Sequence, residues 1–507
     1  MVALPAILLL FIGVVPLEAA NILILAPMPL YSHTYAFVAI FKELAVRGHN
    51  VTFVSPYPLK DPPPNWRDVE VGYVPYTANS IKTMMDGPYS FYFALNDFCK
   101  TLMEKVFQEK LFMEFLEYDT TKYDLLLLES HFCQEPLIAI SHKQKIPAVT
   151  FQAMSLTPWY SFLSGNEVSL HLQPNMRSPY TNRMSFLQRL HNFFINVLEL
   201  CIHYYDYIPH QQALMDKYIR YPGYENRPSL LDMLRNTSLT LMDYHFSVGY
   251  PEPLLPNVIP VGGLSAKIGE KLPEEFKNIM DNAKEGVVYL NFGSVLNSKQ
   301  LPEGMLETVL AAMGELNHTV LMKWDQENVP NKPKNVLIRK WYPQPGILAH
   351  PNIRIFITHA GLHGITEAPS AGVPVLCVPF FADQEFNSRY AEQAGFGITL
   401  LPNELTKESI VNSVVKIINE PRYKENAVAR SNILHDRPTP PIDSAIYWIE
   451  YVIRHKGAKH LRPARNDLSL YEVLGIDIAL FILSIAVLPF LFLILLCRRR
   501  ATKVKQD

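Results

Sequence analysis

Residues between Trp341 and Gln384 carry, in chain order, the side chains that could bind a nucleotide joined to a sugar. Trp341 offers an aromatic face on which a pyrimidine can stack, for about 1–3 kcal/mol. Gln344 can hydrogen-bond the base edge or the ribose. His359 lies between a predicted strand and a predicted helix, where an imidazole and helix-end amides form an anion site suited to a diphosphate. Glu367, further along that helix, can accept hydrogen bonds from two ribose hydroxyls.

Further polar residues extend this set at both ends. Asp383 and Gln384 follow the next predicted strand and can hydrogen-bond the hydroxyls of a hexose. Gly293 and Ser294 end an earlier predicted strand, where a backbone amide and a hydroxyl can approach a phosphate closely. Each residue alone would be an ordinary core, turn or surface residue. The ordered set favours a nucleotide-sugar site.

The motifs Trp-x-Pro-Gln, Thr-His-x-Gly, Gly-Val-Pro and Asp-Gln at these spacings closely resemble the donor-binding signature of the UDP-glycosyltransferases. The resemblance implies an inverting enzyme with the GT-B fold, and it adds Gly361 to the donor site. The family reads Thr-His-Gly-Gly where this chain has Ala360 at the third position. A negative φ there would make the extra methyl group harmless. His363 stands where animal members commonly have Asn, and it could add a donor or fill space.

The resemblance places the general base far from this segment, at His33 in the sequence PLYSHTYAF. We expect His33 in the loop after the first strand, facing a cleft, where an imidazole titrates near neutral pH. A carboxylate that orients the imidazole would complete the pair. The family has Asp at the end of the relevant strand, whereas this chain offers Glu129. Glu135 is a second candidate, but its place in the next helix favours a structural role.

The sequence contains no Asp-x-Asp pair. Enzymes that bind a diphosphate through Mg²⁺ or Mn²⁺ usually need clustered hard oxygen ligands. We therefore expect no metal and no cofactor besides the UDP-sugar co-substrate, with the leaving group stabilised by His359, Ser294 and backbone amides.

These side chains must be positioned by two sets of alternating strands and helices, because 507 residues are too many for one core. Short apolar runs alternating with helical stretches predict α/β domains with parallel sheets. We expect two Rossmann-like domains, with the active site in the cleft between them at the carboxyl ends of the strands. The expected divisions are 21–250 for acceptor binding, 251–284 for a linker rich in Pro and Gly, 285–440 for UDP-sugar binding, and 441–472 for a helix returning toward the first domain.

Both ends of the chain indicate a membrane protein of the secretory pathway. Residues 1–20 resemble a cleavable signal peptide. Residues 473–497 contain an uncharged run long enough to span a bilayer, and the basic tail 498–507 favours a cytosolic C-terminus with a luminal body. Lys503 and Lys505 resemble a dilysine retrieval signal. These features predict a single-pass type I protein of the endoplasmic reticulum membrane, with glycosylation candidates at Asn50, Asn236 and Asn317.

Charge and cysteine content argue against a nucleic-acid-binding protein and against a metal site built from cysteines. A net charge of −2 gives no electrostatic footprint for nucleic acid, and the five cysteines lack metal-ligand spacing, although an isolated disulfide is compatible with them. A homo-oligomer is also compatible with the sequence. The segment Met184–Tyr207, rich in Phe, Leu, Ile and Tyr, is either a core helix pair or a surface that meets the bilayer. Its few basic residues favour the core.

The resemblance extends over nearly the whole chain, including the stretch YWIEYVIRHKGAKHLRP that is typical of the animal membrane-bound branch. Insect members of that branch usually transfer glucose, so the implied reaction is attack of an acceptor on the anomeric carbon of UDP-glucose. The apolar first half suits small lipophilic acceptors. Two alternatives remain. One is a non-catalytic UDP-sugar or lipophile-binding protein, which Ala360 and Glu129 would favour. The other is an enzyme of glycolipid synthesis with ceramide as acceptor.

Overall fold

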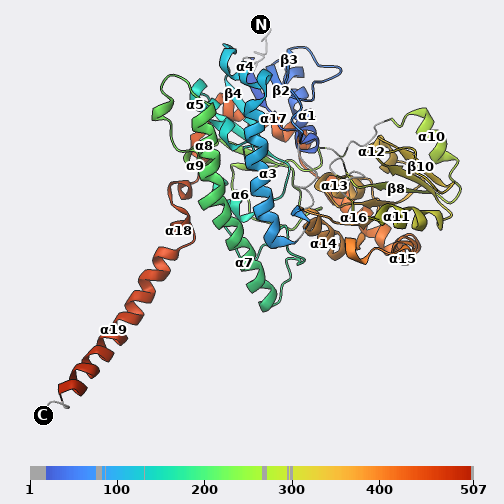
Figure 1. Cartoon of the computed structure of the whole chain (residues 1–507). Coiled ribbons are helices and arrows are strands. Elements are labelled where there is room, and N and C mark those ends of the chain that lie inside the picture. Colours follow the sequence, from blue (N-terminus) through green and yellow to red (C-terminus); the bar gives the residue numbers. More distant parts are fainter. Residues whose placement is uncertain are drawn as a thin grey trace, which may run out of the picture.

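The computed structural model describes residues 19–75, 83–85, 87–130, 132–264, 266, 271–293, 296 and 301–503. The expected signal peptide therefore lies outside the described residues, apart from Ala19 and Ala20. Two parallel β-sheets, each in its own α/β domain, lie side by side, and a long C-terminal helix leaves the body (Figure 1).

The first sheet has seven parallel strands in the order β3-β2-β1-β4-β5-β6-β7. Their bounds are β1 (Asn21–Leu25), β2 (Asn50–Ser55), β3 (Trp66–Glu70), β4 (Leu125–Leu128), β5 (Ala148–Gln152), β6 (Leu239–Met242) and β7 (Val258–Pro260). The central strands are apolar at successive positions, because both faces of the sheet are covered. One face packs against α1 (Tyr31–Val46) and α17 (Pro441–Arg454), and the other against the remaining helices of this domain.

The second sheet has six parallel strands in the order β10-β9-β8-β11-β12-β13. Their bounds are β8 (Val287–Asn291), β9 (Thr319–Lys323), β10 (Val336–Arg339), β11 (Ile353–Thr358), β12 (Val375–Cys377) and β13 (Gly397–Thr399). In both sheets the strand order reverses direction beside the first strand of the domain. This switch point is where ligands of open α/β sheets bind, outside the carboxyl ends of the strands.

Helices connect the strands in both domains. In the first domain they are α3 (Pro88–Gln108), α4 (Lys110–Tyr118), α5 (Ala139–Gln144), α6 (Pro158–Ser164), α7 (Phe186–Ile202), α8 (Ile208–Tyr218) and α9 (Leu230–Arg235). In the second domain they are α10 (Glu274–Asp281), α11 (Met305–Gly314), α12 (Gln344–Leu348), α13 (Leu362–Ser370), α14 (Gln384–Gln393), α15 (Lys407–Asn419) and α16 (Pro421–His435). A single π-helical turn, His203–Tyr207, makes α7 and α8 continuous.

The division expected at residue 250 is too early. β7 pairs in parallel with β6 and completes the first sheet, so the first domain continues to Pro260. This strand was not predicted, because it has only three residues and lies among several Pro and Gly residues, which are typical of a linker. The linker expected over 251–284 also contains α10, which packs through Met280 in the core of the second domain.

The helix α17 crosses back to the first domain, as Figure 1 shows. Its buried residues Ala445, Ile446, Ile449 and Val452 belong to the same core as α1. At the surface, Nη2 of Arg47 donates to Oδ1 of Asp443 at 2.5 Å. The chain thus ends its second domain by packing on its first, which joins the two domains by a second connection.

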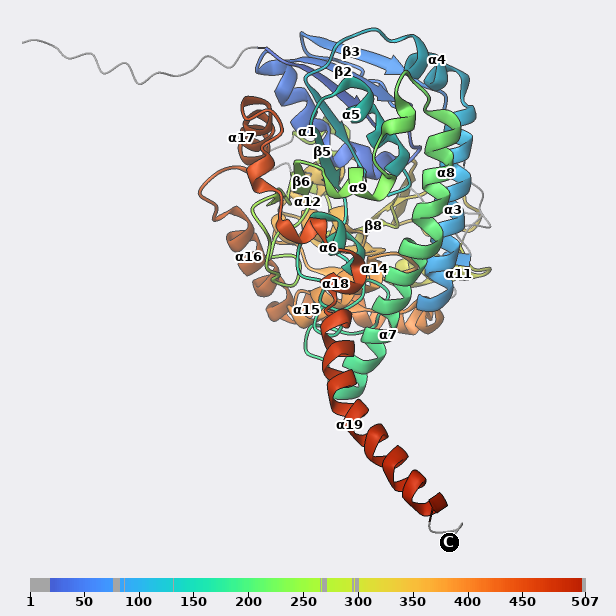
Figure 2. The ribbon, with the colours of Figure 1, turned by 90° about the vertical axis from the view of Figure 1, so that its left-hand side faces the viewer.

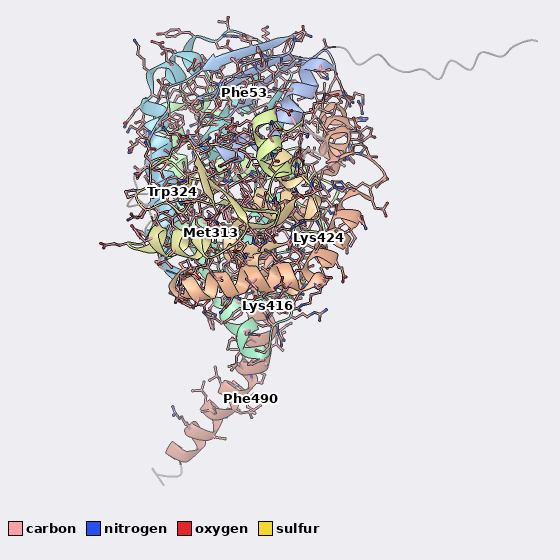
Figure 3. The ribbon with its side chains drawn as sticks, turned by 90° about the vertical axis from the view of Figure 1, so that its right-hand side faces the viewer. Phe53, Met313, Trp324, Lys416, Lys424 and Phe490 are labelled. Carbon is pink, nitrogen blue, oxygen red and sulfur yellow. A yellow bond between two sulfur atoms is a disulfide. The ribbon has the colours of Figure 1, made fainter. Side chains whose placement is uncertain are left out.

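The last helices are α18 (Leu470–Val473) and α19 (Ile476–Lys503). Within α19, Ile476–Arg498 is long and apolar enough to cross a membrane, and none of it is buried against the body. Figure 3, in which the second domain faces the viewer, shows Phe490 on α19 well clear of both domains. An apolar helix left uncovered in this way is what a membrane anchor requires.

Candidate active site

A cavity of about 630 Å³ lies between the two domains, within the usual size for a small-molecule site. Residues of both halves line it. From the expected site it is lined by His33, Gly293, Trp341, Gln344, His359, Gly361, Glu367, Asp383 and Gln384. Ser294 falls outside the described residues. Glu129 does not line the cavity itself and lies behind His33.

His33 is held by a buried carboxylate. Its Nδ1 lies 2.8 Å from Oε1 of Glu129, whose side chain is 2% exposed. Because a carboxylate can only accept, the proton of this bond belongs to Nδ1, which leaves Nε2 of the ring with a lone pair. Glu129 follows β4 directly, as the sequence predicted. His33, however, lies in the first turn of α1 and not in a loop, because the helix begins three residues earlier than its apolar periodicity suggested.

The imidazole of His33 also stacks on Phe132, with ring centroids 4.8 Å apart. The next residue, Cys133, forms a disulfide with Cys99 of α3. Glu135, the second candidate partner of His33, instead accepts a hydrogen bond from the hydroxyl of Tyr207 at 2.7 Å. Burial raises the pKa of Glu135 to about 8. Glu129 is therefore the carboxylate that contacts the histidine, and Glu135 belongs to the core.

Three residues from separate elements form a hydrogen-bonded chain on the donor side. Nδ2 of Asn291, at the end of β8, donates to Oε1 of Gln344 at 2.6 Å. Nε2 of Gln344 in turn donates to Oε2 of Glu367 at 2.7 Å. Trp341, just before α12, is 59% exposed, so a face of its ring remains accessible for stacking. The residues expected to bind the base and the ribose are thus hydrogen-bonded to one another.

His359 follows β11 and is enclosed by two glycines. A Cβ atom at Gly293 would lie 2.7 Å from its Nε2, and one at Gly361 would lie 2.5 Å from the same atom. Both positions must therefore lack a side chain. Burial, with the nearby charges of Lys323 and His363, lowers the pKa of His359 to about 3. The imidazole is therefore neutral near pH 7, with one ring nitrogen that donates a hydrogen bond and one that accepts.

Lys323 is a lining residue that the sequence reasoning missed. Its Nζ donates to the backbone carbonyl of Gly293 at 2.6 Å and lies 4.9 Å from the centroid of the Trp341 ring. Burial lowers the pKa of Lys323 to about 8. The residue ends β9, so the rule that ligands bind at the carboxyl ends of parallel strands could have identified it.

Asp383 caps α14, and Gln384 is its first residue. Oδ2 of Asp383 accepts from Nδ2 of Asn387 at 2.8 Å, and burial raises the pKa of this carboxyl. Oε1 of Gln384 accepts from the backbone amides of Phe380 and Phe381, at 2.8 and 3.2 Å. The oxygen of Gln384 thus holds its own loop, and the residue also lines the cavity.

Two departures from the family pattern have structural consequences. Ala360 has φ of +62°, so the negative φ that would have made its methyl group harmless is not adopted. His363 does more than fill space, because its Nε2 lies 3.3 Å from Oδ2 of Asp243, which follows β6 in the first domain. Burial alone would lower the pKa of His363, but the carboxylates of Asp243, Glu367 and Asp383 raise it. The pair joins the two domains at the cleft.

The three glycosylation candidates lie at the surface. Asn50 begins β2, Asn236 follows α9 and Asn317 precedes β9, and all three are exposed. Within the described residues, no group of three or more His, Cys, Asp and Glu side chains is arranged to hold a metal ion.

Solved structures that are similar to this chain share its fold. The glycotransferase of kitacinnamycin has a TM-score of 0.57 and 16% identity, covering 85% of this chain and 99% of that chain. CalG4, the calicheamicin glycosyltransferase, has a TM-score of 0.55 and 19% identity, covering 86% of this chain and 99% of that chain. The protein therefore has the GT-B glycosyltransferase fold, which confirms the fold expected from the sequence.

Sequence comparison narrows this class. The family described as UDP-glucoronosyl and UDP-glucosyl transferase matches residues 68–506. UDP-glycosyltransferase UGT5 of Dactylopius coccus is 34% identical over 476 residues, 92% of this chain and 89% of that protein. UDP-glucuronosyltransferase 1A9 of Homo sapiens is 30% identical over 504 residues, 95% of this chain and 91% of that protein. The chain belongs to the UDP-glucoronosyl and UDP-glucosyl transferase family.

Proposed function

We propose that the protein is an inverting, metal-independent hexosyltransferase that uses a UDP-sugar and a small lipophilic acceptor, with His33 as the general base. The observation that carries this proposal is the 2.8 Å contact between Nδ1 of His33 and Glu129, on the wall of the cavity that the expected donor residues also line. An inverting transfer needs a base that can deprotonate the acceptor beside the bound donor, and a carboxylate that orients this base.

In the proposed reaction Nε2 of His33 takes the proton of the acceptor hydroxyl. The acceptor oxygen forms a bond to the anomeric carbon from the face opposite UDP, and the bond between that carbon and the β-phosphate oxygen breaks. The electron pair leaves with UDP, and the configuration of the sugar inverts. Glu129, one of the buried carboxylates, stabilises the imidazolium that forms.

The developing charge on the leaving diphosphate would be met by two kinds of group. The neutral imidazole of His359 and the backbone amides near Gly293 and Gly361 donate hydrogen bonds. Lys323 supplies the positive charge, since its ammonium group lies at the carbonyl of Gly293 on the same wall. No metal enters this proposal, because these residues provide donors and charge themselves.

We propose glucose as the sugar and a membrane-soluble compound as acceptor. A relative named UDP-glucosyltransferase 2, from Dactylopius coccus, is 34% identical over 92% of this chain, which supports glucose. The first domain lines its part of the cavity with Phe91, Leu95, Phe98 and Phe132. Such a wall suits flat, apolar acceptors.

We also propose that α19 anchors the protein in the endoplasmic reticulum membrane, with the catalytic body in the lumen. The uncovered apolar span of α19 supports an anchor, and Arg498 and the basic residues after it support a cytosolic tail. The disulfide between Cys99 and Cys133 fits an oxidising compartment.

Release of UDP from UDP-glucose, measured with a panel of phenols, tests the enzyme proposal. His33→Ala should lower kcat about 10²–10⁴-fold while UDP still binds, because only the proton transfer is lost. His171→Ala, an exposed histidine outside the cavity, is the matched control and should match wild type. Equal turnover by His33→Ala and wild type with every acceptor would exclude His33 as the base.

One observation favours a second candidate function, a non-catalytic UDP-sugar-binding protein. The positive φ of Ala360 places an alanine in a strained conformation between His359 and Gly361. A wild-type protein that binds UDP but releases none from UDP-glucose or UDP-glucuronate, with any acceptor, would establish this alternative.

A further inference from the structure

Asn291, the last residue of β8, lies in the expected donor site, although the sequence motifs did not include it. It lines the cavity and links two parts of that site. Its Oδ1 accepts from the backbone amide of Gly293 at 2.8 Å, and its Nδ2 donates to Oε1 of Gln344 at 2.6 Å. Nδ2 also donates to the hydroxyl oxygen of Tyr289 at 3.2 Å. Asn291 thus connects the loop expected at the phosphates with a residue expected at the base or the ribose.

The two ends of this hydrogen-bonded chain fix the orientation of both side-chain amides. The backbone N–H of Gly293 can only donate, so the oxygen of Asn291 faces it and the nitrogen faces Gln344. At the other end a carboxylate can only accept, so the nitrogen of Gln344 faces Glu367, at 2.7 Å, and its oxygen faces Asn291. Both ends require the same direction of donation. Each amide is therefore held in one of its two possible orientations.

The three side chains come from separate elements of the second domain, β8, α12 and α13. Figure 1 shows α12 and α13 on the side of this domain that faces the first domain. Figure 2, in which the first domain faces the viewer, shows β8 and α12 behind it. The hydrogen bonds of Gln344 to Asn291 and to Glu367 are both partly buried. Because water competes less for such bonds, their direction affects how the side chains are held.

We propose that Asn291 is a positioning residue for recognition of the ribose. It holds the oxygen of Gln344, which turns the nitrogen of that amide toward Glu367, and this second bond places the Glu367 carboxylate for the ribose hydroxyls. The inference rests on the UDP-sugar site proposed above, in which Glu367 accepts from those hydroxyls. It goes further by assigning to Asn291, acting through Gln344, the discrimination between a ribonucleotide and a 2′-deoxyribonucleotide.

Asn291→Asp tests the direction of these hydrogen bonds without changing the shape of the side chain. Aspartate can accept from the amide of Gly293 but cannot donate to Gln344. Because two facing oxygens repel, the amide of Gln344 turns its nitrogen toward residue 291 and its oxygen toward Glu367, which breaks the bond that places Glu367. Asn291→Ala is a second variant, which removes the bond to Gln344 altogether.

Isothermal titration of the full chain with UDP and with 2′-deoxy-UDP measures the effect as the ratio of the two Kd values. Both ligands carry the same diphosphate, so the negative charge that Asn291→Asp adds near the phosphates cancels from the ratio. The wild type should bind UDP about 10–100-fold more tightly than 2′-deoxy-UDP, the value of a hydrogen bond to a charged group. Asn291→Asp and Asn291→Ala should each lower this ratio about tenfold. Asn412→Asp, on the exposed side of α15 and outside the cavity, is the matched control and should keep the wild-type ratio.

A measurement of stability tests the same direction of donation without a ligand. In Asn291→Asp both neighbours of Gln344 are carboxylates, and the nitrogen of the Gln344 amide faces only one of them. Glu367→Gln supplies a donor at the other end, so that the whole chain of hydrogen bonds can run in reverse. Asn291→Asp should therefore lower Tm, and Glu367→Gln combined with it should recover part of the loss. A packing role predicts no recovery, because Glu367→Gln changes no shape.

The outcomes separate this inference from the proposed function. A wild-type ratio near one would overturn the role of Asn291 and leave UDP binding intact. A wild type that binds neither nucleotide would overturn the UDP-sugar site and this inference together. A ratio that falls in Asn291→Ala but not in Asn291→Asp would show that only the volume of the side chain matters, which also overturns the inference. The same holds if the double variant recovers none of the lost Tm.

Discussion

At the scale of single residues, Lys323 adds to the proposed donor site a positive charge that the sequence motifs did not include. His359 is neutral, so the proposed diphosphate site needs another source of positive charge, and Nζ of Lys323 lies between Gly293 and the ring of Trp341. We predict that Lys323→Gln raises the Kd for UDP about 10–100-fold, the value of a hydrogen bond to a charged group. Uridine, which lacks phosphates, should bind as before. Isothermal titration with both ligands measures the difference.

Two controls sharpen this prediction. Lys42 lines the cavity from the first domain, so Lys42→Gln should leave the Kd for UDP unchanged. Because burial lowers the pKa of Lys323 to about 8, UDP affinity of the wild type should fall as pH rises through that value, and the Lys323→Gln variant should lack this step. Equal losses of UDP and uridine affinity in the variant would show that Lys323 acts only by supporting Trp341.

The strained backbone at Ala360 gives a second prediction at this scale. An alanine with positive φ costs about 1 kcal/mol relative to glycine, which adopts this conformation freely. Ala360→Gly should therefore raise Tm slightly. It should also lower the KM for the UDP-sugar, because it relaxes the backbone between His359 and Gly361, which line the cavity, although Ala360 itself is buried behind them. Ala458→Gly is the matched control, because Ala458 also has positive φ but lies away from the cavity. It should raise Tm and leave the KM unchanged, whereas an equal KM change in both variants would contradict our explanation.

At the scale of elements, much of the fold could be predicted from the sequence, because buried parallel strands are continuous apolar runs. The strands that carry Gly293, His359 and Glu129 were predicted within a residue or two. Four strands, β3, β6, β7 and β13, were missed. β3 is largely polar at an edge of the sheet, and the other three have only three or four residues each. Contacts between elements, such as Lys323 with Gly293, could not be predicted, because they depend on loop geometry that no periodicity encodes.

The loop after β4 illustrates how one element positions another. It carries Glu129 and Phe132, which hold His33, and Cys133 ties it to α3 through Cys99. We predict that reduction of this disulfide lowers kcat/KM for the acceptor without changing the Kd for UDP. The loop that holds His33 would no longer be bonded to α3, which lines the cavity from the first domain, whereas the second domain contains no part of the disulfide. Initial rates with and without reductant measure the effect.

Two variants test whether the disulfide is responsible. Cys133→Ser should have the activity of the reduced enzyme in either condition. Cys201→Ser removes an exposed free cysteine and should respond to reductant as the wild type does. A reductant effect of equal size in Cys133→Ser would assign the loss to another group.

At the scale of the whole molecule, the two domains are joined by α17 and by polar contacts across the cleft. α17 buries its apolar residues against α1, which fixes the end of the second domain on the first. The hydroxyl of Tyr390, in α14, donates to the carbonyl of Ser247 at 3.0 Å. His363 and Asp243 add an ion pair beside the cavity itself. One of the contacts between the two domains therefore depends on a titratable group.

That dependence leads to a prediction for stability against pH. The pKa of His363 is raised in the folded protein, so its pairing with Asp243 stabilises fully below the unfolded value near 6.5 and is lost as pH rises through the folded pKa. His363→Asn should therefore lower Tm most below about pH 6, with the difference from wild type shrinking at higher pH.

Arg437 also lies near Asp243 but stays charged throughout this range, and burial lowers the pKa of His245 to about 4, so neither produces the same step. Asp243→Asn should abolish the same pH dependence, and Tm values for the three proteins between pH 5 and 9 measure it. A constant difference between wild type and His363→Asn across that range would show that His363 acts by packing and not by its charge.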